Sequence, residues 1–346
     1  MRILYIGMKY EYGKKELGYS FEHYNFYDSL AKMNNEIIYF PFDEIILEKG
    51  RDEMNKELLK TVKREKPDFC FFFLFQDEIK KQTIEKITQE KGVTTFNWFA
   101  DDHFRFCNFS KYYAPLFDWI STTDSQAVKK YYSKNVIKTQ WACNHSLYKP
   151  FNLEKIYDVS FVGQPHSDRR KIVNQIRKAE INIKCWGNGW KAGRVSQDEM
   201  IKIFSQSKIN LNLTKSSGNI NFKALASVFL KKELNNSLKL INPKYWIPNL
   251  QSILDKKREQ IKGRNFEIPG SGGFLLTSNA DNLTDYYEDG KEIIIYKNIN
   301  DMIDKIKYYL EHDEERESIA QAGHERTIRE HTYEKRFNNI FKRIYD

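Results

Sequence analysis

The sequence predicts an α/β protein made of two doubly wound halves, each with a mostly parallel sheet covered by helices on both faces. Short apolar runs alternate with longer amphipathic runs along the chain. Residues 69–75 are almost continuously apolar, as expected for a strand that is buried on both faces. The alternation breaks at 149–153 and then restarts, so we expect two Rossmann-like domains.

The first domain is predicted to span residues 1–150 and the second 151–330, with residues 216–263 as a polar insertion rich in Asn and Lys. The last segment, 331–346, has an apolar helix face and is expected to cross back to the first domain. Strands are expected at 2–7, 36–42, 68–75, 94–99, 119–123 and 138–142, and then at 158–163, 182–187, 208–213, 273–278 and 292–296. Helices are expected at about 20–33, 51–66, 77–91, 125–133, 168–179, 197–206, 301–311 and 314–330.

Composition sets limits on partners and location. The net charge of +9 is spread along the chain, which weakly favours an anionic partner such as phosphate groups or a membrane surface. A basic surface without any binding role explains it equally well. No compact basic–aromatic motif supports nucleic-acid binding, so no nucleic-acid partner is expected. We find neither a signal peptide nor an apolar run long enough to span a bilayer, and the four cysteines lack metal or redox spacing. A cytoplasmic protein is therefore expected, with peripheral membrane contact left open.

The stretch 264–277 joins a basic residue, a lone carboxylate, a glycine-rich turn and an apolar strand. Backbone N–H groups at such a turn can approach an anion closely, and the carboxylate of Glu267 could accept hydrogen bonds from a sugar or ribose diol. This pattern indicates a nucleotide-sugar site. A connection in which Pro and Gly only shape the bend is an equally good interpretation. The turn residues concerned are Gly270, Ser271, Gly272 and Gly273.

Several short motifs follow one another in a specific order in the second half. They are Phe161-Val162-Gly163, Arg169, Trp186-Gly187-Asn188-Gly189-Trp190, residues 207–213, Gly263-Arg264-Asn265-Phe266-Glu267, residues 290–293, 319–323 and 331–336. This series resembles the CgeB-like ("spore maturation" type) glycosyltransferases, within the group-1 glycosyltransferases of GT-B fold. The resemblance covers roughly 155–213 and 262–340. It is looser in the first half, through residues 97–102 and 141–144.

The resemblance implies two Rossmann-like domains facing a cleft, with a nucleotide-sugar donor on the C-terminal domain and a hydroxyl acceptor on the N-terminal one. A UDP-sugar is the first choice of donor, and the acceptor could be a glycan, lipid, protein or small molecule. It implies neither a cofactor nor a metal, because protein cations and helix ends neutralise the diphosphate. A catalytically inactive protein of the same fold, an epimerase and a coat scaffold remain alternatives.

The resemblance assigns donor contacts to the second domain. Glu267 would contact hydroxyls of the ribose or sugar. Glu259 and Glu267 also have the E-x7-E spacing of a carboxylate pair that the wider family uses, one for the sugar and one for the ribose. Glu259, however, lies in a charged run typical of a solvated helix face. Lys262 and Arg264 are candidates for the diphosphate, where cations would stabilise the leaving group. Gly163 ends a predicted strand, but Gln164 stands where many group-1 enzymes have a basic residue. The remaining donor candidates are Arg169, after that glycine, and Gly187, in a tight turn beside the base.

In the first domain, Asp101, Asp102 and His103 follow the strand predicted at 94–99. Polar residues at the carboxyl end of a parallel strand point into the ligand crevice. If the transfer inverts the sugar, these residues are the leading candidates for the general base. If it retains the configuration, they would only bind sugar hydroxyls, and structural roles are the alternative. Three glycines are expected to shape the loop bordering the cleft: Gly7, Gly13 and Gly18.

Overall fold

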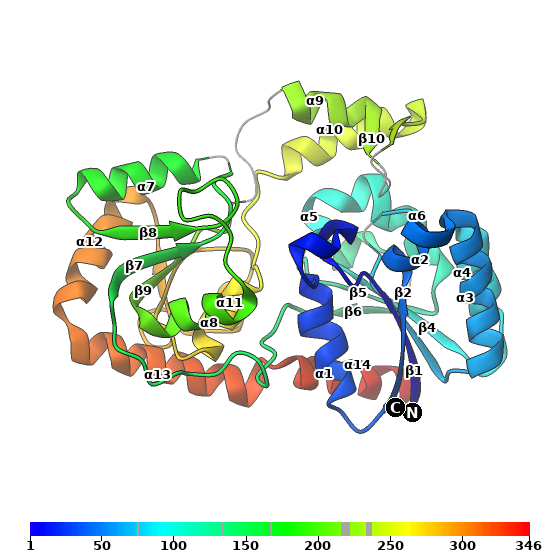
Figure 1. The fold of residues 1–346 in the computed structure, drawn as a ribbon, viewed down its shortest axis with the longest axis horizontal. Coiled ribbons are helices and arrows are strands. Elements are labelled where there is room, and N and C mark those ends of the chain that lie inside the picture. The colour runs from blue at the N-terminus through cyan, green and yellow to red at the C-terminus, as the bar shows by residue number, and fades with distance from the viewer. Residues whose placement is uncertain (75, 133–134, 167, 216–221, 233–236) are drawn as a thin grey trace. The chain divides into compact units, whose positions relative to one another are not determined.

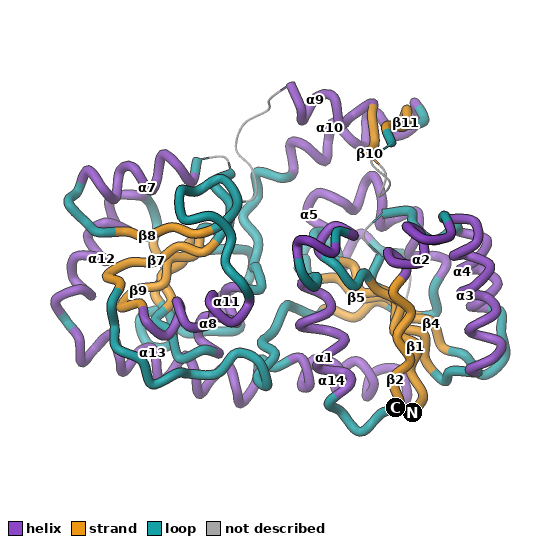
Figure 2. Tube along the Cα trace, in the orientation of Figure 1, coloured by secondary structure: helices purple, strands orange, loops and turns teal. Residues whose placement is uncertain are grey.

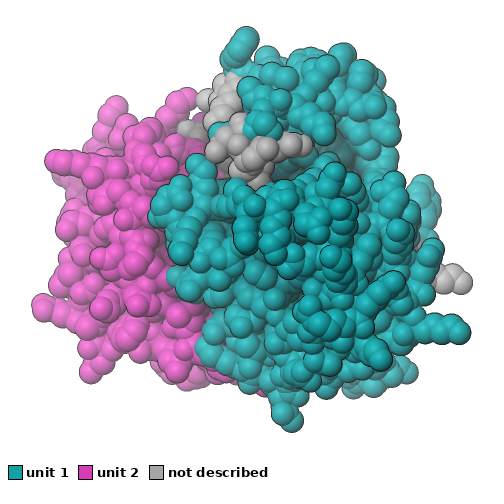
Figure 3. Space-filling view, turned by 45° about the vertical axis from the view of Figure 1, so that its right-hand side comes forward, with its two compact units in different colours: residues 1–140, 220–255, 337–346 teal, residues 141–219, 256–336 magenta. Residues whose placement is uncertain are grey.

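The computed structural model describes residues 1–74, 76–132, 135–166, 168–215, 222–232 and 237–346. The chain divides into two compact units (Figure 3). Unit 1 comprises 1–140, 220–255 and 337–346, and unit 2 comprises 141–219 and 256–336. In each unit the strands form a central sheet with helices and loops around it (Figure 2). The predicted α/β class with two Rossmann-like domains is confirmed.

Unit 1 has a six-stranded parallel sheet in the order β2-β1-β3-β4-β5-β6 (Figure 1). The chain starts at β1, goes to one side for β2 and returns to the other side for β3, so the strand order reverses between β1 and β3. In doubly wound sheets, ligands bind at the carboxyl ends of the strands near such a reversal. The strands are β1 (Arg2–Gly7), β2 (Glu36–Pro41), β3 (Phe69–Phe72), β4 (Thr94–Phe99), β5 (Trp119–Thr122) and β6 (Val136–Lys138).

Alternate residues of these strands face opposite sides of the sheet. Leu4 belongs to one buried cluster with Met54 and Leu58, which lie one turn apart on α3 (Arg51–Glu65). On the other side, the ring of Phe71 lies 5.7 Å from that of Phe337 in α14 (Tyr333–Tyr345). The other helices of unit 1 are α1 (Asp28–Ala31), α2 (Phe42–Lys49), α4 (Lys81–Thr88), α5 (Asp102–Arg105), α6 (Lys111–Tyr113) and the π-helical turns His23–Tyr27 and Phe106–Ser110.

Unit 2 has a five-stranded parallel sheet in the order β13-β12-β9-β7-β8, and here the order reverses between β7 and β9. The strands are β7 (Tyr157–Val162), β8 (Ile183–Trp186), β9 (Ser207–Asn212), β12 (Leu275–Ser278) and β13 (Ile294–Tyr296). The helices are α7 (Arg169–Lys178), α8 (Gln197–Gln206), α11 (Arg264–Gly270), α12 (Ile299–Glu311) and α13 (Asp313–Glu330).

The predicted insertion contains α9 (Phe222–Phe229), the antiparallel strands β10 (Leu230–Lys232) and β11 (Leu238–Leu240), and α10 (Trp246–Asp255). The structure groups residues 220–255 with unit 1, whereas the sequence assigned them to the second domain. The reason lies in α10, which packs against α5 and the π-helical turn Phe106–Ser110. There Asn108 Nδ2 donates to Asn249 Oδ1 at 3.0 Å.

Candidate functional site

Polar side chains meet at the carboxyl edge of the unit 2 sheet, where the central strands β9 and β12 end. Asn212 Nδ2 donates to Asn265 Oδ1 at 3.0 Å, and Asn265 Nδ2 donates to Thr277 Oγ1 at 3.2 Å. The backbone N–H of Lys262 donates to the same Asn265 oxygen at 2.9 Å. This network holds the first turn of α11 against both strands. Asn212 and Thr277 were not among the predicted site residues, although each places a polar side chain in a largely apolar strand.

Glu267 lies in this first turn of α11 and is completely buried. Its Oε2 forms an ion pair with Arg264 Nη1, three residues earlier. Its Oε1 is buried and has no hydrogen-bond partner among the described residues. A buried acceptor without a donor is costly, so this oxygen is suited to receive a hydroxyl from a ligand. The structure thus brings together two of the predicted donor residues, the carboxylate and a cation.

Glu259 also reaches this edge of the sheet. Thr214, just beyond β9, donates its hydroxyl to Glu259 Oε2 at 2.9 Å, and the hydroxyl groups of Thr214 and Ser278 are in contact. The expectation that Glu259 lies on a solvated helix face is therefore wrong. This residue is half-buried in the loop after α10. Only the tertiary contact with the end of β9 reveals this position.

The glycine-rich turn after Glu267 caps the C-terminus of α11. Gly272 has φ +70° and donates its N–H to Pro269 O at 2.8 Å, while Gly273 donates to Ile268 O at 3.0 Å. This pairing is a Schellman motif. Ser271 likewise donates its N–H to Glu267 O. The expectation that these N–H groups cradle a phosphate is therefore wrong for Ser271, Gly272 and Gly273, because the carbonyls of α11 already occupy them.

Gly270 has a packing role. A Cβ there would collide with the sulfur of Cys143, which would have to move to admit any other residue. The turn therefore contributes to the site by ending α11 where Glu267 and Arg264 face the strand ends.

The structure brings Gly163 and Gly187 together, since they follow the neighbouring strands β7 and β8. Arg169, at the start of α7, donates to Gln164 O at 3.0 Å and to Leu213 O at 2.7 Å. Its guanidinium thus joins the loops after β7 and β9, and burial lowers its pKa. These contacts favour a structural role over direct contact with a diphosphate. Lys262 is half-buried at the start of α11.

In unit 1, Asp101, Asp102 and His103 follow β4 at the carboxyl edge, in and beside α5. Asp102 is completely buried and accepts hydrogen bonds from Ser110 Oγ at 2.5 Å and Tyr131 Oη at 2.7 Å. His103 is also buried. Asp101 is half-buried and has φ +54°, a left-handed conformation that Asp tolerates better than most residues. Of the three, Asp101 is the least buried.

The loop after β1 holds the three predicted glycines. Gly7 ends β1, Gly13 is buried with φ +68°, and Gly18 is exposed with φ +80°. Asp43 anchors the start of this loop by accepting the backbone N–H of Lys9 at 2.8 Å. The glycines therefore shape a loop at the carboxyl edge of the unit 1 sheet.

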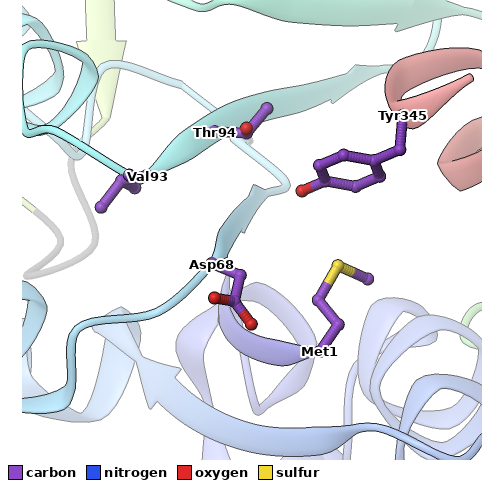
Figure 4. A pocket seen from close by; sticks show the side chains of 6 residues that line it. Met1, Asp68, Val93, Thr94 and Tyr345 are labelled. Atoms are coloured by element: carbon purple, nitrogen blue, oxygen red, sulfur yellow. The ribbon is translucent and has the colours of Figure 1, made fainter.

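Two cavities lie apart from Glu267 and the ends of β9 and β12. One of about 620 Å³ is at the amino ends of the unit 1 strands, lined by Met1, Asp68, Val93, Thr94, Gly92 and Tyr345 (Figure 4). The other, of about 690 Å³, lies beside the edge strand β8 and α7. It combines the aromatic rings of Tyr157, Trp186 and Trp190 with four cations, Arg170, Arg177, Lys184 and Lys191. The guanidinium of Arg170 is already engaged beside this cavity, because it donates to Gly189 O at 2.6 Å.

Burial raises the pKa of Asp102 from 3.8 to about 6, more than its hydrogen bonds with Ser110 and Tyr131 lower it. A carboxyl with a raised pKa stabilises the fold below its unfolded pKa and loses that contribution as the pH rises through the folded value. From pH 4 to 7, the stability of Asp102→Asn relative to the unchanged protein should therefore rise, by up to about 3 kcal/mol. Melting temperatures at several pH values test this.

Asp52→Asn serves as the control for this pH dependence. The pKa of Asp52 is lowered by its hydrogen bond with Lys80, so the contribution of Asp52 to the stability of the fold increases as the pH rises. Parallel pH curves for Asp102→Asn and the unchanged protein would contradict the buried, raised carboxyl.

Within the described ranges, no group of three or more His, Cys, Asp or Glu side chains is arranged to hold a metal ion. A metal-free mechanism without cofactors remains a prediction. None of the helices in the described part of the chain is long and apolar enough to cross a membrane.

Comparisons with known proteins agree with this geometry. A family model described as "Glycosyl transferase-like" matches residues 169–228 and 232–342. Spore protein CgeB of Bacillus subtilis (strain 168) is 21% identical over 291 residues, covering 82% of this chain and 85% of that protein. The resemblance to CgeB-like proteins is thereby confirmed.

Solved structures share the fold at low sequence identity. A sucrose-phosphate synthase from Thermosynechococcus elongatus has a TM-score of 0.61 at 8% identity, with 99% of each chain covered. Anabaena Alr3699/HepE in complex with UDP-glucose also has a TM-score of 0.61, at 9% identity and with 99% of each chain covered. The GT-B fold predicted from the resemblance is confirmed, and the chain is similar to the glycosyl transferase-like family over residues 169–228 and 232–342.

Proposed function

We propose that this protein transfers a sugar from a nucleotide-sugar, with a UDP-sugar as the first choice, to a hydroxyl group of an acceptor. The observation that carries the proposal is Glu267, a buried carboxylate with one oxygen paired to Arg264 and the other without a hydrogen-bond donor in the described part of the chain. The match to the glycosyl transferase-like family model supports sugar transfer, and the choice of UDP follows the similar HepE, whose structure holds UDP-glucose.

In the proposed reaction, the bond between C1 of the sugar and the diphosphate breaks while the acceptor oxygen bonds to C1. The hydroxyl proton passes to a base, and the nucleotide leaves with increased negative charge. Glu267 Oε1 would accept a hydroxyl of the donor and so orient it. Arg264, whose side chain is 29% exposed, can turn toward the diphosphate, and Lys262 lies at the start of the same helix. Cations there stabilise the leaving group without a metal.

If the sugar is inverted, Asp101 is the preferred general base. Asp102 has both oxygens engaged by Ser110 and Tyr131, so it fits a role in holding the loop. The same observation supports the second candidate function, a nucleotide-sugar-binding protein without turnover, since a carboxylate held by two hydroxyl donors is not available as a general base.

The experiment that tests the proposal is a thermal-shift screen with UDP, GDP, dTDP, CMP and their sugar conjugates, with EDTA present. We expect one nucleotide family to raise the melting temperature. Release of that nucleotide from its sugar conjugate, on addition of a hydroxyl acceptor, would then separate transfer from binding alone. A shift that requires manganese would contradict the metal-free site, and no shift with any nucleotide would contradict the donor site.

A further inference from the structure

The segment 222–255 exposes an unusual amount of apolar surface. Phe222 is 88% exposed, Ile247 82% and Leu238 70%. Nine of the nineteen exposed large hydrophobic residues in the described part of the chain lie in this segment. Exposed apolar surface on this scale marks an interaction site. We call the following nine residues the hairpin patch: Phe222, Leu225, Phe229, Leu230, Leu238, Leu240, Ile247, Leu250 and Leu254.

In each of the two helices, the residues of the hairpin patch recur at helical spacing and so lie on one face. In α10, Ile247, Leu250 and Leu254 are spaced i, i+3, i+7 and so share one face. The opposite face, with Ser252 and Ile253, is buried against unit 1.

Helix α9 repeats the arrangement, with Phe222, Leu225 and Phe229 at the same spacing and Val228 buried. The two helices lie side by side, with β10 at one end (Figure 1). Asn249 Nδ2 ties them together by donating to Val228 O at 3.0 Å. The outward faces are therefore apolar while the inward faces are already packed.

Cations without carboxylate partners gather next to α10 in unit 1. The ammonium groups of Lys81 and Lys111 lie 5.6 and 4.9 Å from the ring centroid of Tyr112. The ring of Tyr245 lies 5.2 Å from the ring of Tyr112, and Lys244 lies over Tyr245. None of these three lysines forms an ion pair within the described residues. Their charges are thus available to an anionic surface.

We propose that the hairpin patch docks onto the surface of an anionic lipid bilayer, with Lys81, Lys111 and Lys244 beside the lipid phosphates. Helices with one apolar face and neighbouring lysines bind in this way, with the apolar face in the boundary between headgroups and acyl chains. Interfaces between proteins are instead depleted of Lys at their centres, which argues against a second copy of this chain as the occupant. The inference goes beyond sugar transfer and does not depend on it.

The test is co-sedimentation of the 346-residue chain with vesicles of phosphatidylcholine, with and without phosphatidylglycerol. We expect binding to the anionic vesicles only. The double variant Ile247→Ser/Leu254→Ser should lower the partition coefficient at least about tenfold, because it removes two exposed apolar side chains that binding would bury in the bilayer. Lys111→Glu/Lys244→Glu should do the same by reversing charge.

Leu47→Ser/Phe151→Ser is the matched control, since these exposed apolar residues lie outside the hairpin patch, and it should bind like the unchanged protein. Three results would overturn the proposal: no binding to anionic vesicles, unchanged binding of the Ile247/Leu254 variant, or self-association that this variant abolishes. Because no donor is present in the assay, each result is independent of whether the protein transfers sugar.

Discussion

Replacing Glu267 by alanine is expected to lower kcat/KM for the donor by about 100-fold or more, because hydrogen bonds from ligand hydroxyls to a charged, buried oxygen are lost. The rise in melting temperature with the nucleotide-sugar should disappear as well. The fold should survive, since the partner left behind, Arg264, is partly exposed and can reach water. Steady-state kinetics and thermal shift on the purified variant check both effects.

Glu199→Ala is the matched control for this result. Glu199 is an exposed glutamate of the same unit and closes the capping box of α8 with Ser196. Its removal should lower the melting temperature modestly through loss of the cap, with donor use unchanged. If Glu267→Ala retains both donor binding and turnover, the assignment of Glu267 is wrong, whatever happens to its stability.

The strands could be predicted because a short segment that is buried on both faces consists almost entirely of apolar residues. Phe69–Phe72 lies at the centre of a sheet with both faces covered, so each of its residues is apolar. The first and last residues of the strands and helices were predicted less accurately than the presence of these elements. The strand expected at 273–278 begins at Leu275, because the N–H of Gly273 is used to cap α11. The helix expected at 125–133 is reduced to the 3₁₀ turn Val128–Lys130 among the described residues.

The grouping of residues 220–255 with unit 1 could not be predicted from the sequence, because α10 carries apolar residues on two faces. Ile253 packs inward while Ile247 points outward, and the sequence does not tell which neighbour either face meets. For residues of the candidate donor site, too, the sequence does not tell which contacts they make. Glycines with positive φ serve equally well in an anion cradle and in a helix cap, so the turn at Gly272 was open to both interpretations. The role of Glu259 depends on Thr214, forty-five residues away.

Gly187→Ala is expected to destabilise unit 2 by about 3 kcal/mol or more, through strain and overpacking together. Gly187 has φ +134°, a conformation that residues with a Cβ rarely adopt. An added Cβ would also lie 2.5 Å from the backbone oxygen of Gly163, which is an atom that no side-chain rotation can move away. Both glycines stand at the same carboxyl edge of the unit 2 sheet as the proposed donor site, so displacement of the loops there should weaken donor binding as well as stability.

Gly193→Ala separates this close approach from backbone strain alone. Gly193 has φ +71° and lies in the same loop region, where its N–H donates to Trp190 O, but an added Cβ meets no atom within 4 Å. Its cost should therefore be limited to the left-handed backbone, about 1 kcal/mol. Thermal unfolding of the two variants side by side measures the difference. Equal melting temperatures would mean that the loops after β7 and β8 relax freely around the new methyl group, and Gly187 would then be needed for its conformation and not for the contact with Gly163.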